Sequence, residues 1–207
     1  MHPRSSQKFT GKSLKVIIQM QAPLIAIFAG SFDPIHIGHM ALANYLFYQI
    51  EGLTQLWFLP TAQNPIKGKA ELSFGKRCNL IDKVIEGDSR FSCCRIEGSL
   101  PSPHYTIHTL DALQADYPRY RFGLIIGADN WVQRIKWYHW EELVAKYPLW
   151  VYPRPEYPIG NTDMEPNVHL LSDAPLLEVS STAIRQAREK GQDFRYWLPR
   201  PDLFDLL

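Results

Sequence analysis

Cysteine, net charge and long hydrophobic runs are all scarce in this 207-residue sequence. The three cysteines, Cys78, Cys93 and Cys94, form no Cys-x-x-Cys pair, so neither a disulfide framework nor a cysteine zinc site is expected. The number and spacing of the cysteines instead indicate reduced thiols in a cytoplasmic protein. Cys93 and Cys94 are neighbours in an expected strand, so we predict that they pack on opposite faces. No apolar run approaches the length of a membrane span.

The balance of charges excludes some kinds of partner. The formal net charge is +1, with 45% hydrophobic and 21% charged residues, which are ordinary values for a soluble domain. Without a broad basic field, neither nucleic acid nor an anionic membrane is an expected partner. Small anionic substrates remain compatible, since they need only a local positive pocket. The oligomeric state stays open.

The N-terminal segment differs in composition from the rest of the chain. Four lysine or arginine residues occur before residue 22, and the first acidic residue is Asp33. Transit peptides share this composition, but the apolar stretch at 16–18 is too short for a secretory core. We therefore predict a dispensable extension at 1–22 and a single domain at 23–207.

From about residue 24 onward, short apolar runs alternate with longer segments of helical spacing. The apolar runs predict strands at 24–29, 55–59, 91–96, 121–126 and 148–152. Helical periodicity predicts helices at 38–50, 73–86, 105–116 and 138–146, and a loop is expected at 153–167. This alternation predicts an α/β fold in which a mostly parallel sheet is covered by helices on both faces.

Polar clusters follow three of the predicted strands, at 30–39, 60–67 and 127–130. In parallel α/β sheets, ligands bind outside the carboxyl ends of the strands. We therefore expect these clusters to meet in one site.

The first cluster combines a glycine turn with two histidines. Gly30 is expected to turn the chain sharply off the strand, and Pro34 stiffens the loop. His36 and His39 lie three residues apart at a helix start, beside free N–H groups and the positive end of the helix dipole. Gly38 leaves room for a ligand. The spacing would also suit two metal ligands, but no nearby Cys or Glu completes such a site, so we predict no metal-ligating residues.

A second cluster lies near the C-terminus, in EVSSTAIRQAREKG at 178–191. Ser180 or Ser181 can cap the helix that follows. Ser181, Thr182 and Arg185 then share one face at the helix N-terminus and form a second candidate anion site. Taken alone, this segment favours a capped amphipathic helix over an anion site.

Together, GSFDPIHIGH and VSSTAIR closely resemble the two signature motifs of the HxGH nucleotidylyltransferase superfamily. The resemblance runs from about residue 24 to the C-terminus. The intermediate segments HYTIHTL, FGLIIGADNW, IKWYHWEEL and VYPRPEYP are similar to those of the bacterial nicotinate-nucleotide adenylyltransferase family.

The resemblance implies a Rossmann-like, doubly wound domain that joins ATP to nicotinate mononucleotide and releases pyrophosphate, with Mg²⁺ carried mainly by the ATP phosphates. It implies catalytic roles for His36, His39 and Arg185. It assigns ATP binding to Gly30, Ser31, Phe32, Gly38, Gly127, Asp129, Ser181 and Thr182. It assigns substrate binding to Lys67, Tyr105, Thr106, Trp137, Tyr138 and Arg154, with the Trp137 indole stacked on the pyridine ring.

One segment departs from the family pattern, and alternatives remain. Family members commonly carry a PPHK-like segment after the second strand, where this chain has Asn64-Pro65-Ile66-Lys67. The acceptor could instead be nicotinamide mononucleotide or phosphopantetheine, and a non-catalytic nucleotide-binding regulator is a rival of another class. Because the attacking group would already be a phosphate oxyanion, no Ser–His–Asp triad is needed.

Overall fold

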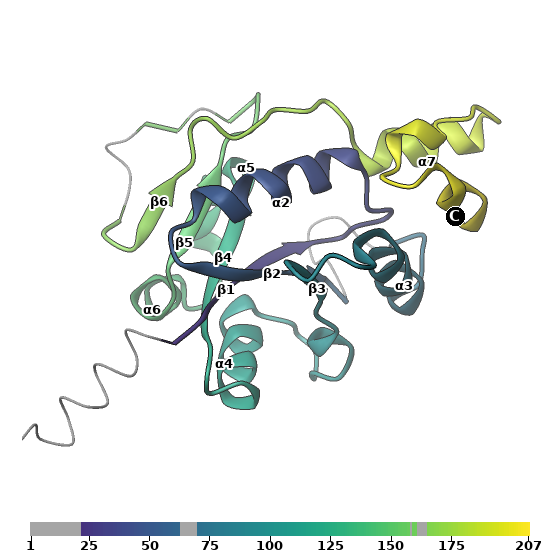
Figure 1. Ribbon diagram of the computed structural model, residues 1–207. Coiled ribbons are helices and arrows are strands. Elements are labelled where there is room, and N and C mark those ends of the chain that lie inside the picture. The colour runs from purple at the N-terminus through teal and green to yellow at the C-terminus, as the bar shows by residue number, and fades with distance from the viewer. Residues whose placement is uncertain (1–21, 63–69, 158, 161–164) are drawn as a thin grey trace, which may run out of the picture.

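The computed structural model describes residues 22–62, 70–157, 159–160 and 165–207 (Figure 1). The strands are β1 (Leu24–Gly30), β2 (Leu53–Pro60), β3 (Phe91–Cys93), β4 (Arg121–Gly127), β5 (Leu149–Tyr152) and β6 (Val168–Leu170). The α-helices are α2 (Ile37–Gln49), α3 (Phe74–Ile85), α4 (Thr106–Asp116), α5 (Ala128–Trp131), α6 (Trp140–Lys146) and α7 (Ser181–Glu189). Short 3₁₀ helices are η1 (Ile96–Gly98), η2 (Arg134–Lys136), η4 (Arg195–Trp197) and η5 (Pro201–Leu206).

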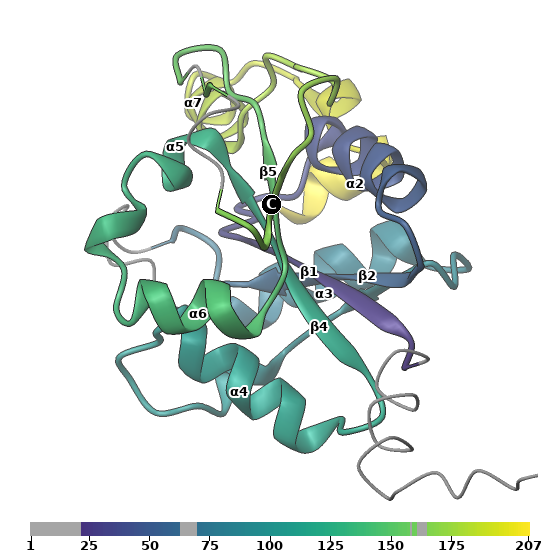
Figure 2. The same cartoon turned by 90° about the vertical axis from the view of Figure 1, so that its left-hand side faces the viewer.

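The six strands form one sheet in the order β3-β2-β1-β4-β5-β6. Every ladder between these strands is parallel. Helices α2, α3 and α7 lie on one side of the sheet, and α4 and α6 lie on the other (Figures 1 and 2). Their buried side chains belong to two separate hydrophobic cores. The predicted doubly wound, Rossmann-like α/β fold is confirmed.

Strand β1 lies at the centre of the sheet and contributes side chains to both hydrophobic cores. Successive side chains of a strand point to opposite faces. Accordingly, Ala26 and Phe28 join the core under α2 and α3, while Ile25 and Ile27 join the core under α4 and α6. The strand therefore reads as a continuous apolar run, as expected of a strand buried on both faces.

The thiols follow the same rule. Cys93 packs against the core under α3, whereas Cys94 belongs to the opposite core, so the predicted division between faces is confirmed. All three cysteines, Cys78 included, are free.

The structure differs from the predicted elements in three places. β3 ends at Cys93 rather than 96, because the chain turns into η1. The four-residue helix α5 follows β4 directly, and β6 falls just beyond the predicted loop. β6 is only three residues long and pairs with β5 alone; so short a run carries little periodicity.

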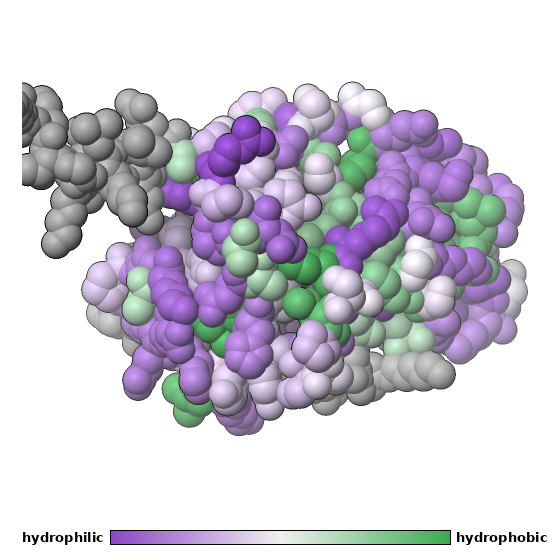
Figure 3. Space-filling model, turned by 90° about the horizontal axis from the view of Figure 1, so that it is seen from below, coloured by the Kyte–Doolittle hydropathy of each residue, from purple (hydrophilic) through white to green (hydrophobic). Residues whose placement is uncertain are grey.

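The exposed surface of the described residues is mixed. The face shown in Figure 3 is largely hydrophilic, with a small central hydrophobic area. Within the described ranges, no helix has the length and apolar character to cross a membrane.

Candidate active site

The strand order changes direction beside β1. The chain runs outward from β1 to β2 and β3, and then returns to β4 on the other side of β1. Ligands bind outside the carboxyl ends of the strands at such a switch point. Gly30 ends β1 and Gly127 ends β4, so two of the predicted clusters begin at this switch point.

The sharp turn after β1 occurs at Phe32 rather than at Gly30. Phe32 has φ 47°, in the left-handed region that non-glycine residues seldom adopt. A Cβ on Gly30 would lie 3.0 Å from Cζ of Phe32, so the glycine makes room for that ring. Phe32 is 1% exposed and packs edge-on against His39 with 4.9 Å between ring centroids. Its ring supports the histidine, and a nucleotide would meet its backbone.

The two histidines are held together at the N-terminus of α2. Their rings stack with centroids 3.6 Å apart, and the backbone N–H of His36 donates to Nδ1 of His39 at 3.2 Å. Because Nδ1 accepts, the neutral His39 ring carries its proton on Nε2. A Cβ on Gly38 would lie 3.0 Å from the His36 ring. Gly38 thus accommodates that ring, where the sequence predicted room for a ligand.

His36 is buried and neutral at pH 7. Burial, reinforced by the positive charge of Arg154, lowers the pKa of His36 to about 4. Its Nδ1 is buried and has no hydrogen-bond partner among the described residues. The His36 side chain faces the backbone N–H of His39 in a capping box at the start of α2, so this ring is part of the helix N-terminus.

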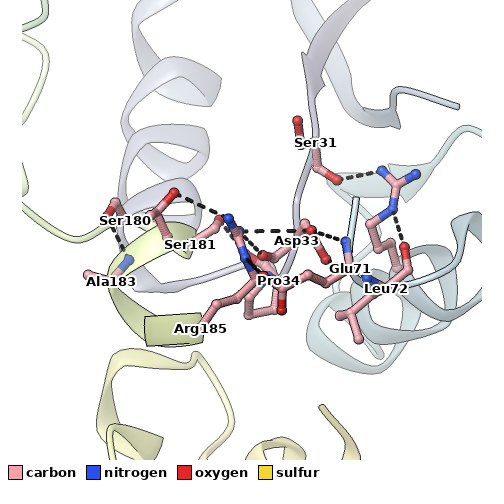
Figure 4. A network of polar contacts seen from close by, with 11 residues as sticks. Ser31, Asp33, Pro34, Glu71, Leu72, Ser180, Ser181, Ala183 and Arg185 are labelled. Atoms are coloured by element: carbon pink, nitrogen blue, oxygen red, sulfur yellow. Dashed lines mark hydrogen bonds and ion pairs between the residues drawn. The ribbon is translucent and has the colours of Figure 1, made fainter. Parts of the chain in front are cut away.

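The C-terminal motif docks onto the loop after β1 (Figure 4). Ser180 is the cap of α7 and accepts from the Ala183 N–H at 3.1 Å. The Ser181 hydroxyl donates to the Pro34 carbonyl at 2.8 Å, which resolves the choice between the two serines. Arg185 Nη1 donates to the Asp33 carbonyl at 2.7 Å. The tertiary structure thus joins the two predicted phosphate motifs.

Asp129 and Arg154 form a third group at the ends of β4 and β5. Arg154 Nη2 donates to the Tyr152 hydroxyl at 2.9 Å, and its Nε lies 3.6 Å from Asp129 Oδ1. Asp129 Oδ1 is buried without a hydrogen-bond partner in the described part of the chain. A Cβ on Gly127 would lie 2.3 Å from that oxygen. Arg154, predicted to bind the substrate, therefore contacts residues predicted to bind ATP.

The residues predicted to hold the nicotinate half occupy two neighbouring segments. The Tyr105 and Tyr138 rings stack at 4.3 Å, joining the start of α4 to the segment before α6. Thr106 is the first residue of α4. Trp137 is half-buried and packs edge-on against Trp140. Lys67 and the rest of the Asn64–Lys67 segment lie outside the described residues.

The sequence did not single out the buried charges of Arg77 and Asp33, which shape the site. Arg77 of α3 is 2% exposed and donates to the carbonyls of Ser31 at 2.6 Å, Thr61 at 2.9 Å and Leu72 at 3.2 Å. The second, Asp33, is 4% exposed. In the sequence Arg77 resembles any exposed helix residue, so no local signal marks it.

A buried glutamate ties the loop after β2 to α4. Glu97 accepts from the Ala62 N–H at 2.8 Å and from the Thr109 hydroxyl at 3.4 Å. Burial raises the pKa of Glu97. This carboxyl therefore holds the backbone at Ala62 against α4. The described residues contain no group of three His, Cys, Asp or Glu side chains placed to hold a metal.

Comparisons with known proteins identify the family. A cytidylyltransferase-like family model matches residues 27–187. A probable nicotinate-nucleotide adenylyltransferase of Porphyromonas gingivalis is 48% identical over 185 residues, which are 89% of this chain and 93% of that protein. The chain belongs to the nicotinate-nucleotide adenylyltransferase family. A second member of the family, the probable enzyme of Bacteroides fragilis, is 47% identical over 83% of this chain and 85% of its own length.

Solved structures of nicotinate-nucleotide adenylyltransferases share the fold. A putative enzyme from Vibrio parahaemolyticus superposes with a TM-score of 0.65 at 24% identity, covering 88% of this chain and 97% of its own. The Plasmodium falciparum nicotinic acid mononucleotide adenylyltransferase, solved in complex with NaAD, gives 0.66 at 22% identity over 82% and 86%. At these identities the likeness concerns the fold.

Proposed function

We propose that this chain transfers the adenylyl group of ATP to nicotinate mononucleotide, giving nicotinate adenine dinucleotide and pyrophosphate. The observation that carries the proposal is the docking of the two phosphate motifs. Ser181 bonds to Pro34 and Arg185 to Asp33, so a cation and two helix N-termini converge at the switch point of the sheet.

The reaction needs no covalent enzyme intermediate. A phosphate oxygen of the mononucleotide attacks the α-phosphorus of ATP and forms the new P–O bond. The bond from that phosphorus to the bridging oxygen of the β-phosphate breaks, and its electron pair leaves with pyrophosphate. Such transfer depends on positioning and on stabilising negative charge.

The motif residues supply that stabilisation. His36 and His39, whose rings stack at the N-terminus of α2, contact the phosphates there. Arg185 and Thr182 approach them from α7. Gly127 and Asp129, at the end of β4, lie along the adenosine. The backbone from Gly30 to Phe32 lies beneath the bound nucleotide. Gly38 leaves space for the His36 ring.

The residues present fit a Mg²⁺ ion that is carried by the nucleotide. Both oxygens of Asp33 already accept backbone N–H groups, and the described residues offer no cage of three ligands. Phosphate oxygens and water would therefore supply most of the coordination, as Mg²⁺ prefers. When bound, the ion neutralises phosphate charge.

The acceptor is expected to bind beside Tyr105, Thr106, Trp137 and Tyr138, with Lys67 as a further phosphate contact. A carboxylate only accepts hydrogen bonds, whereas an amide also brings two donors. The first backbone N–H groups of an α-helix such as α4 have no carbonyl acceptor within the helix, so they can donate to a carboxylate of the bound mononucleotide. We therefore assign the acid rather than the amide, and we place the reaction in the cytoplasm, where free thiols persist.

The test compares kcat/KM for three acceptors: nicotinate mononucleotide, nicotinamide mononucleotide and phosphopantetheine, each with ATP and Mg²⁺. A site built to pair the carboxylate rejects the mismatched amide by about 10³ or more. Pyrophosphate release is the readout.

Trp137→Ala is the matched variant. Since both pyridines stack equally on an indole, this variant should weaken both mononucleotides and leave their ratio unchanged. Equal kcat/KM values for acid and amide in the wild-type protein, or a preference for the amide, would contradict the assigned acceptor.

A further inference from the structure

The guanidinium of Arg185 is held from three directions by the chain itself (Figure 4). Nε donates to Glu71 Oε1 at 2.7 Å, Nη1 to the Asp33 carbonyl at 2.7 Å, and Nη2 to Thr182 Oγ1 at 3.4 Å. A guanidinium carries five N–H groups. These bonds fix its plane and leave one N–H on each Nη for a ligand.

The backbone that carries Glu71 is itself firmly held. The Glu71 and Leu72 N–H groups donate to the two oxygens of Asp33 at 2.8 Å and 3.0 Å. The Leu72 carbonyl accepts from the buried Arg77 at 3.2 Å. The Glu71 side chain is 54% exposed, yet its base is anchored to the same loop that Arg185 binds.

From this geometry we propose that Glu71 is a positioning residue, which orients Arg185 so that its two remaining N–H groups meet the phosphates of ATP. The inference rests on the proposed function and adds a residue that lies outside both phosphate motifs. Glu71 acts through Arg185, and its own carboxylate touches no substrate.

The carboxylate of Glu71 has two opposite effects on ATP binding: its charge repels the triphosphate, and its hydrogen bond orients Arg185. A carboxylate beside a triphosphate repels it, so charge alone would make Glu71 unfavourable for ATP. What remains in its favour is the hydrogen bond that fixes the guanidinium. A glutamine at this position keeps an acceptor oxygen and removes the repulsion, so it separates the two effects.

A matched control lies in the same open cavity. Glu71 and Arg185 line a space of about 260 Å³ whose wall also includes Arg188 and Glu189. Glu189 brings a second carboxylate close to the arginines. No hydrogen bond or ion pair joins Glu189 to Arg185 within the described part of the chain.

The experiment measures kcat, KM for ATP and calorimetric binding of Mg²⁺–ATP for Glu71→Ala, Glu71→Gln and Glu189→Ala. Misplacing one catalytic contact costs up to about a hundredfold, so we expect Glu71→Ala to lose roughly tenfold or more in kcat/KM for ATP. We expect Glu71→Gln and Glu189→Ala to stay within about twofold of the wild-type protein, by the same reasoning.

A double-mutant cycle shows whether Glu71 acts through the arginine. In the Arg185→Ala background, Glu71→Ala should have no further effect, because the group that it orients is gone. A full additional loss in that background would overturn the inference. Tighter ATP binding by Glu71→Ala would also overturn it, because the wild-type carboxylate would then weaken ATP binding by repelling the phosphates.

The outcomes also separate this inference from the proposed function. If the wild-type protein forms no product from nicotinate mononucleotide, the proposed acceptor is wrong, and ATP binding still decides the role of Glu71. If the wild-type protein is active and Glu71→Ala matches it, only the role of Glu71 is wrong.

Discussion

One hydrogen bond at the start of α2 decides which nitrogen of His39 can donate. Nδ1 accepts the His36 backbone N–H, so the proton of the neutral ring lies on Nε2. The stacked His36 ring and the edge of Phe32 hold His39 in place. Its orientation is therefore set before any ligand arrives, as electrostatic stabilisation of a transition state requires.

Replacing His39 with alanine should lower turnover while the protein stays folded. Removing one preorganised donor typically costs about 10²–10³ in rate. Steady-state kcat and the melting temperature of His39→Ala provide the check. Near-normal turnover in a folded variant would show that the histidine is structural.

His36 makes the stability of the protein depend on pH. Its pKa falls from 6.5 to about 4 on folding, so the unfolded chain binds the proton more tightly. The stability contributed by the neutral ring is complete above pH 6.5 and is lost as the pH falls towards 4. The difference corresponds to about 3 kcal/mol.

Urea unfolding at pH 7, 6, 5 and 4 measures this dependence. The free energy of unfolding of the wild-type protein should fall more steeply with acid than that of His36→Asn, which has no imidazole to protonate. Parallel pH profiles for the two proteins would contradict the buried, neutral state of His36.

At the scale of elements, α3 organises loops that belong to other elements. Arg77 reaches from α3 to carbonyls that follow β1 and β2. The polar loops at the carboxyl edge of the sheet therefore share one buried cation. Without it, these carbonyl oxygens would lose a charged donor in a partly buried site, which is costly.

We predict that Arg77→Met destabilises the protein by roughly 3 kcal/mol or more, because methionine fills space but donates nothing. The exposed neighbour Lys76 supplies the control: Lys76→Met should change the stability by less than about 0.5 kcal/mol. The denaturant midpoints of Arg77→Met and Lys76→Met measure this difference in stability. Equal midpoints would show that the loops do not depend on Arg77.

At the scale of the whole molecule, the described fold begins at Ala22. The Ala22 carbonyl accepts from Arg121 Nε at 3.2 Å, and the Pro23 carbonyl accepts from the Arg121 N–H at 2.9 Å. These bonds tie the start of β1 to β4. Composition predicts that the first 22 residues are dispensable, whereas the bond to Arg121 makes Ala22 part of the fold.

A chain that begins at Ala22 should keep the melting temperature and kcat of the full chain, because both bonds to Arg121 are retained. A second chain that begins at Leu24 removes them and is expected to melt earlier. Loss of activity in the chain beginning at Ala22 would show that residues 1–21 take part in folding or catalysis.

The family and the α/β class followed from local patterns. Apolar runs and helical spacing are properties of neighbouring residues, so four helices were predicted to within about two residues at each end. The two motifs were recognisable because their residue types and spacing serve phosphate binding directly. The short β6 was missed, since three residues carry no usable period.

What only the tertiary structure decided are the contacts between distant segments. The Ser181–Pro34 bond spans 147 residues, and no local rule assigns the cap to Ser180 and the docking bond to its neighbour. The same holds for Arg77, which binds carbonyls after β1 and β2, and for Glu71, whose partner Arg185 lies in α7. The sequence by itself determined the elements and the chemistry of the motifs, because both depend on near neighbours. The strand order alone set the carboxyl ends of β1 and β4, with Gly30 and Gly127, beside each other, because crossover connections place residues by topology rather than by sequence distance.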